Sequence, residues 1–122
     1  ELVARVDRPS FGIHFDFVNL LNTYERAYDP IALIKEAVET LAPWIRSVHF
    51  KDFNFGSGFP SHIQECAPGK GELDCAAALL ALAPLGEDMP LGLEHLSKDE
   101  EYREAAGALR AANASLSQPV TL

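Results

Sequence analysis

Long apolar runs, cysteine and positive charge are all scarce in this sequence. No hydrophobic stretch approaches the ~20 residues of a membrane-spanning helix, so we expect a soluble, globular protein without a membrane partner. There are two cysteines, Cys66 and Cys75, and no secretory signal pattern, so we expect reduced thiols and a cytoplasmic location. Lys and Arg number 10 against 18 Asp and Glu, and the net charge of −8 argues against a nucleic-acid partner.

The residues that are present alternate between predicted strands and predicted helices. Strands are expected at residues 11–16, 45–50 and 91–94, each a short apolar run bounded by turn residues. A helix is expected after each strand, and the expected N-cap residues are Asp29, Asp74 and Ser97. Ser97 and Glu100 have the spacing of a capping box, and that last helix is expected to reach about Ala112. This order predicts an α/β fold with a parallel sheet and right-handed crossovers.

Two long connections interrupt this pattern, and the sequence predicts loops at residues 17–28 and 53–70. Pro68-Gly69-Lys70-Gly71 lacks the spacing of a phosphate-binding loop. It is therefore either a plain turn or a turn that covers a substrate. Residues 115–122 show no pattern and are expected to fray. Residues 1–5 look like the end of a helix, so we expect the chain to begin inside a longer protein.

Each expected strand ends in a side chain that can bind a metal ion, namely Asp16, His49 and Glu94. Because parallel strands bring their carboxyl ends to one rim, we expect these three groups to converge. A single strand that ends in a polar side chain is common in proteins. Three strands that all end in a metal-binding side chain favour a metal site. The mixed nitrogen and oxygen donors suit one divalent ion, Mn²⁺, Mg²⁺, Co²⁺ or Zn²⁺.

Strand alternation sorts the residues around His49 into two faces. It places Ile45, Ser47, His49 and Lys51 on one face and Val48, Phe50 and Asp52 on the other. Lys51 is therefore interpreted as a group that contacts substrate or supports a ligand, with a surface ion pair to Asp52 as the alternative. His14 is interpreted as an interior residue held by hydrogen bonds, in preference to a metal ligand.

Four segments, GIHFDFVN, SVHFKD, PGKGELD and LGLEHL, together resemble the C-terminal part of the xylose-isomerase-like TIM barrels. The sugar phosphate isomerase/epimerase proteins are the most similar group, and the resemblance spans about residues 11–112. It implies a partial (β/α)₈ barrel of three consecutive parallel βα units, with the N-terminal strands absent. Residues 1–122 would then form the C-terminal portion of one barrel domain.

The resemblance also implies a site and a reaction. One divalent ion would be held by Glu, Asp, His and Glu from consecutive strands; Asp16, His49 and Glu94 match the last three, and the first glutamate is expected upstream of Glu1. The implied chemistry is proton transfer next to the carbonyl of a sugar or sugar phosphate through an enediolate, with Glu94 as one acid–base group. Asn19 stands where relatives often carry a histidine that contacts substrate or a further metal ion, and we expect Asn19, Lys51 and Lys70 to contact substrate.

Other functions stay open beside the isomerase or epimerase. A polyol dehydratase would use a similar site. An apurinic endonuclease is disfavoured by Asn19 in place of a histidine and by the negative charge. The third alternative is a non-catalytic or incomplete barrel fragment that acts by association. Unpaired strand edges recruit further chains, so we expect self-association or a missing N-terminal half.

Overall fold

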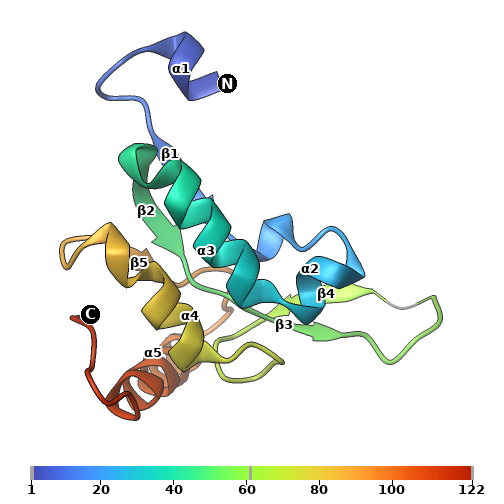
Figure 1. Cartoon of the computed structure of the whole chain (residues 1–122). Coiled ribbons are helices and arrows are strands. Elements are labelled where there is room, and N and C mark those ends of the chain that lie inside the picture. Colours follow the sequence, from blue (N-terminus) through green and yellow to red (C-terminus); the bar gives the residue numbers. More distant parts are fainter. Residues whose placement is uncertain (1, 61, 122) are drawn as a thin grey trace.

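The computed structural model of the protein describes residues 2–60 and 62–121 (Figure 1). A parallel sheet in the order β1-β2-β5 consists of β1 (Ile13–Asp16), β2 (Ile45–His49) and β5 (Leu91–Gly92). The predicted parallel pairing and strand order are therefore confirmed. Two further strands, β3 (Asp52–Phe55) and β4 (Ile63–Cys66), pair antiparallel in a separate hairpin.

In the described part of the chain, five α-helices accompany these strands: α1 (Leu2–Val6), α2 (Tyr24–Tyr28), α3 (Pro30–Leu41), α4 (Cys75–Leu82) and α5 (Asp99–Ala114). Short 3₁₀ turns lie at Val18–Leu20, Ala42–Trp44 and Ala83–Leu85. Helix α3 packs against α4, and α4 packs against α5, so the helices that follow the three parallel strands form one layer (Figure 1). Within the described residues, no helix has the length and apolar character needed to cross a membrane.

Two of the predicted helix starts are confirmed. The Asp29 carboxylate accepts a hydrogen bond of 3.0 Å from the backbone N–H of Ala32 at the start of α3. The Asp74 carboxylate accepts a bond of the same length from the N–H of Ala77 at the start of α4. Each aspartate thus pairs with one of the backbone donors that the first turn of a helix leaves without a partner.

The predicted capping box of α5 is wrong by one residue. Helix α5 has Lys98 as its N-cap, and the carboxylate of Glu101 accepts the N–H groups of Ser97 at 2.7 Å and Lys98 at 3.2 Å. Three consecutive acidic residues follow Lys98, so the sequence offered two glutamates at nearly the same spacing. The backbone geometry selects Glu101, and not Glu100, as the partner.

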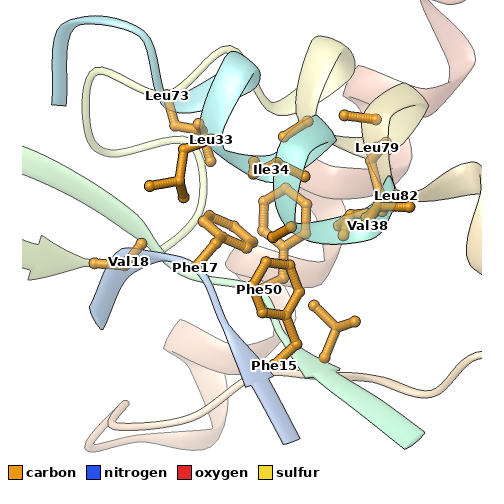
Figure 2. Close-up of a cluster of buried hydrophobic side chains, with 14 of the residues drawn as sticks. Phe15, Phe17, Val18, Leu33, Ile34, Val38, Phe50, Leu73, Leu79 and Leu82 are labelled. Carbon is orange, nitrogen blue, oxygen red and sulfur yellow. The ribbon is translucent and has the colours of Figure 1, made fainter. Parts of the chain in front are cut away.

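The hydrophobic core lies between the parallel sheet and the layer of α3 and α4 (Figure 2). Phe50 is fully buried and meets the ring of Phe17 edge to face, with 5.4 Å between the ring centroids. Burial of one such side chain stabilises a fold by about 1.5–3 kcal/mol. Ile34 and Val38 of α3 reach the same cluster, which fixes the helix over the strands.

A register shift in β2 places Ile45 on a different face of the sheet from the one predicted. The pairing steps from Ile13↔Ile45 to His14↔Ser47, so one extra residue of β2 is accommodated there. Such a bulge reverses the alternation on one side of it. Ile45 is consequently buried in the core with Val48, and it does not share the face of Ser47 and His49.

Both predicted loops contain regular structure, and those two predictions are wrong. Residues 17–28 hold a 3₁₀ turn and α2, whose N-cap Thr23 accepts the N–H of Arg26 at 3.3 Å. Residues 53–70 hold most of the β3–β4 hairpin, which extends away from α4 and α5 and contacts α2 through Phe55 and Tyr28 (Figure 1). At the other end of the chain, the Val120 N–H donates to Asn113 at 2.8 Å in the segment expected to fray.

Candidate metal centre

The parallel sheet brings Asp16 and His49 side by side. They are register partners at the carboxyl ends of β1 and β2, and His49 is in turn the partner of Gly92 at the end of β5. Glu94 lies two residues beyond β5, so the strand predicted at residues 91–94 is shorter than expected. The three side chains nevertheless gather at one rim, as the parallel arrangement predicts.

Asp16, His49 and Glu94 offer ligand atoms that all lie within 4.8 Å of one another. His49 Nδ1 is 2.8 Å from Glu94 Oε1 and 4.0 Å from Asp16 Oδ2. Two ligands of one ion with bonds of about 2.1 Å lie at most about 4.2 Å apart, so small side-chain movements would complete a site. The donor set and its spacing therefore fit a divalent metal ion.

The small and polar neighbours of His49 leave room for its ring. A Cβ atom on Gly92 would come within 3.1 Å of His49 Cδ2, closer than ordinary contact. The rings of His14 and His49 meet edge to face with centroids 3.7 Å apart, and His14 Nδ1 is hydrogen-bonded to the Ser47 hydroxyl. His14 is therefore held by a hydrogen bond as expected, although it is exposed and does not lie in a closed interior.

Asn19 holds Asp16 in place. The Asn19 side-chain amide donates to Asp16 Oδ2 at 2.9 Å, and its backbone N–H is 3.3 Å from Oδ1. Both bonds fix the direction of the carboxylate, in the way that outer groups orient metal ligands. Contact of Asn19 with a substrate stays a prediction.

Lys51 lies among the carboxylates of this cluster, those of Asp16, Glu65 and Glu94, and its side chain is only 4% exposed. Its Nζ is 2.9 Å from Asp16 Oδ2, 2.8 Å from Glu65 Oε2 and 2.7 Å from Glu94 Oε1. Burial alone would lower the pKa of Lys51, but the hydrogen bonds to Glu65, Glu94 and Asp16 outweigh it and raise this pKa well above its ordinary value. Lys51 is therefore a permanent positive charge at the site.

The alternative of a surface ion pair between Lys51 and Asp52 is wrong, because both residues are buried. The Asp52 carboxylate instead accepts four backbone N–H groups, from Phe53 at 2.7 Å, Gly69 at 3.0 Å, Gly71 at 2.9 Å and Leu73 at 2.9 Å. Asp52 thus ties the turn after β4 to the start of β3.

Lys70 does not join the cluster. Its ammonium is 3.4 Å from Glu104 Oε2 of α5, and both side chains are more than half exposed. The turn that carries Lys70 is shaped by Asp52, since a Cβ on Gly71 would lie 2.4 Å from the Asp52 carboxylate. The geometry therefore favours a structural turn, and a substrate role for Lys70 stays a prediction.

Two further residues, Glu65 and His95, belong to this cluster, and neither was predicted from the sequence. Glu65 Oε1 is 2.6 Å from His95 Nδ1, and His95 Nε2 is 3.6 Å from Glu94 Oε2. The pKa values of Glu65 and Glu94 are both lowered, chiefly by their hydrogen bonds to Lys51. His95 stands next to Glu94 in the sequence, which was the available signal. Glu65 could be found only by predicting the hairpin.

Cys66 and Cys75 are both free. Burial is the main cause that raises the pKa of each thiol to about 11, so both are protonated near neutral pH. The expected reduced state fits this environment. The cellular location stays a prediction.

The fold and the rim cluster define an α/β protein in which parallel strands present acidic and histidine side chains at their carboxyl ends. No family model matches the chain. Over 92 residues it is 34% identical to the uncharacterized protein YihM of Escherichia coli (strain K12), a match that covers 74% of this chain and 26% of YihM.

A solved structure gives the clearer likeness. The crystal structure of a xylose isomerase domain protein from Planctomyces limnophilus superposes with a TM-score of 0.64 at 30% identity, over 91% of this chain and 38% of that chain. The chain therefore has a fold like that of a xylose isomerase-like TIM-barrel protein. It spans about a quarter of the length of YihM and less than half of the solved chain.

Proposed function

We propose that this chain is the C-terminal portion of a xylose isomerase-like (β/α)₈ barrel in a sugar or sugar phosphate isomerase or epimerase. Asp16, His49 and Glu94 would hold one divalent ion, with a further glutamate supplied by a preceding strand. The observation that supports the proposal most is the convergence of these three ligand types from three adjacent parallel strands or their ends. A bound ion would polarise a substrate carbonyl and stabilise the charge of an enediolate.

Glu94 is the group that would move the proton. Its Oε1 makes short contacts with His49 and Lys51, whereas Oε2 is 3.6 Å from its neighbour His95. The lowered pKa of Glu94 keeps the carboxylate charged at neutral pH, so it would begin the reaction as a base. The side chains of Glu94 and His49 are about a quarter exposed, which leaves them within reach of a small molecule.

Asp16 and Lys51 would set the electrostatics of the reaction. Asp16 is directed by Asn19, and Lys51 carries a positive charge beside the site, within reach of Glu65. A positive group at this position favours the negative charge that develops on an oxygen when the neighbouring carbon loses its proton. Lys51 and Asn19 are accordingly the residues proposed to contact the substrate.

Deuterium exchange tests this function across a whole class of candidate substrates. The chain, together with the preceding strands that the proposal requires, is incubated with Mn²⁺ and a panel of ketoses, aldoses and their phosphates in D₂O, and NMR follows deuterium at the carbon next to the carbonyl. We expect exchange on at least one sugar and a loss of about 100-fold or more in Glu94→Gln, the range of one general acid–base group. Glu104→Gln, the same charge change on the exposed partner of Lys70, should exchange at the wild-type rate.

Two outcomes would contradict the proposal. One is exchange in Glu94→Gln at the wild-type rate, and the other is a metal-binding protein that exchanges none of the sugars. A dehydratase of polyols begins with the same proton abstraction, and mass spectrometry would reveal it as a product lighter by one water. Cleavage of DNA at an abasic site would point to the endonuclease instead.

A further inference from the structure

Lys51 is a cation that already contacts two of the three proposed metal ligands. Its Nζ lies 2.9 Å from Asp16 Oδ2 and 2.7 Å from Glu94 Oε1. Those two oxygens face His49 Nδ1, at 4.0 Å and 2.8 Å respectively. The ammonium and a divalent ion would therefore draw on the same carboxylate oxygens. Because like charges at such distances repel strongly in a partly buried site, the two cations compete.

A second group of residues contacts Lys51 from outside the proposed ligand set. Glu65 Oε2 is 2.8 Å from Lys51 Nζ, and His95 Nδ1, which donates to the other oxygen of Glu65, lies 3.3 Å from the same ammonium. Glu65 comes from β4 of the hairpin, while Asp16 and Glu94 belong to the rim of the parallel sheet. A metal ion would therefore share Asp16 and Glu94 with Lys51, whereas Glu65 would remain a partner of Lys51 only.

His95 orients Glu65. Its Nδ1 is 2.6 Å from Glu65 Oε1, so the carboxylate is contacted at one oxygen by His95 and at the other by Lys51. The backbone of His95 has φ 59°, in the left-handed region that residues with a side chain rarely occupy. Such a conformation persists only where the surroundings hold it, and here it places the ring between Glu65 and Glu94.

We propose, building on the metal site proposed above, that Lys51 and a divalent cation compete for Asp16 and Glu94, and that Glu65 holds Lys51 when the cation occupies those carboxylates. Glu65 is then a positioning residue and not a metal ligand. It acts through Lys51, and His95 keeps it in place. The hairpin β3–β4 is thereby linked to metal binding at the rim of the other sheet.

A double-mutant cycle measures this link as Mn²⁺ affinity by isothermal titration calorimetry. Glu65→Gln removes the charge that holds Lys51 and should weaken Mn²⁺ binding by about tenfold, since less of the protein has its ligands free of Lys51. Lys51→Met removes the competitor and should strengthen binding. In the Lys51→Met background, Glu65→Gln should change the affinity by less than about twofold, because the effect of Glu65 requires Lys51.

Glu104→Gln is the matched control, with the same charge change beside a lysine on the exposed face of α5. A Glu65→Gln variant with wild-type Mn²⁺ affinity overturns this inference and leaves the proposed metal site standing. Equal weakening by Glu65→Gln in both backgrounds also overturns it, because Glu65 would then act as a ligand or a distant charge. A wild-type protein that binds no Mn²⁺ overturns the proposed metal site and this inference with it. If Lys51→Met does not fold, as judged by circular dichroism, Lys51→Gln replaces it in both arms.

Discussion

Lys51 is the residue on which the charges of the rim depend. Three carboxylates, those of Asp16, Glu65 and Glu94, surround its ammonium within 2.9 Å. A buried ammonium without such partners would lose its proton or destabilise the fold, and three carboxylates without a cation would repel one another. The arrangement is therefore stable as a unit, and the removal of one member changes the others.

Acid should weaken the fold through this unit. The pKa values of Glu65 and Glu94 in the folded protein lie below their ordinary value of 4.5, mainly because of Lys51. A lowered folded pKa contributes stability that is present above the unfolded value and is lost as the pH falls through the folded one. Urea unfolding should therefore show constant stability around pH 6 and a decline below about pH 4.5.

Lys51→Met supplies the comparison for this prediction. Without the ammonium, the two glutamates lose the main cause of their lowered pKa, and the decline in acid should become shallower. Some decline should persist, because the pKa of Glu25 is lowered separately by backbone and Thr23 hydrogen bonds. An acid profile of Lys51→Met as steep as that of the wild type would contradict the role given to Lys51.

The site residues at the ends of the parallel strands could be predicted from the sequence. The residues that contact them from other segments of the chain could not. Asp16 and His49 follow from strand alternation and the shared direction of parallel strands. Glu65 comes from a segment interpreted as a loop, so its approach to Lys51 depends on a hairpin that the pattern did not predict. The turn at residues 68–71 favours Lys70 as a substrate contact in the sequence, whereas its ammonium pairs with Glu104 of α5.

At the scale of elements, the β3–β4 hairpin is fixed to the body of the protein by Asp52. This side chain is fully buried and accepts four backbone N–H groups, one beside it and three in residues 69–73. Four donors and one carboxylate satisfy one another, so no other polar partner is needed. The hairpin that carries Glu65 therefore has a defined position relative to Lys51, the residue before Asp52.

Asp52→Ala should destabilise the protein by about 3 kcal/mol or more, because it leaves several buried N–H groups without an acceptor. Urea unfolding measures the loss. Hydrogen exchange should show lost protection at Gly69, Gly71 and Leu73, which donate to this carboxylate. Asp88→Asn, a change at an exposed turn residue, should leave both measurements unchanged. Retained protection at the three amides in Asp52→Ala would show that the turn holds itself.

The hairpin was missed for a physical reason. Its strands have four residues each, and the segment between Phe55 and Ile63 is rich in glycine and proline. Short strands with weak alternation are hard to distinguish from a loop, and this pair is stabilised by an aspartate that lies at its first position. The helices were easier, because Asp29 and Asp74 mark their starts with a local signal.

At the scale of the whole molecule, the parallel sheet is covered by helices on one face. His14 is exposed on the other face, where Ser47 and His49 are half-buried. β1 and β5 form the edges of the sheet, and within residues 2–60 and 62–121 no further strand pairs with either. In a closed barrel, this polar face would line the interior, and each edge would meet another strand.

We accordingly predict association through the sheet edges and the polar face. Size-exclusion chromatography with light scattering should give a mass above the 13.3 kDa of one chain, falling on dilution. A partner polypeptide that supplies further strands should replace this self-association. A cooperatively folding protein that stays a monomer at every concentration would contradict the prediction and would favour a fold complete in itself.

The central claim is that Asp16, His49 and Glu94 hold one divalent ion, and pulsed electron paramagnetic resonance of Mn²⁺ tests it most directly. A bound Mn²⁺ should show coupling to one imidazole nitrogen, that of His49. His49→Ala should lose this coupling together with more than about 100-fold in affinity, since even outer groups of metal sites change affinity 10–100-fold. His62→Ala, an exposed histidine of the hairpin loop, should keep both. Mn²⁺ that binds without nitrogen coupling, or equally well to His49→Ala, would contradict the account.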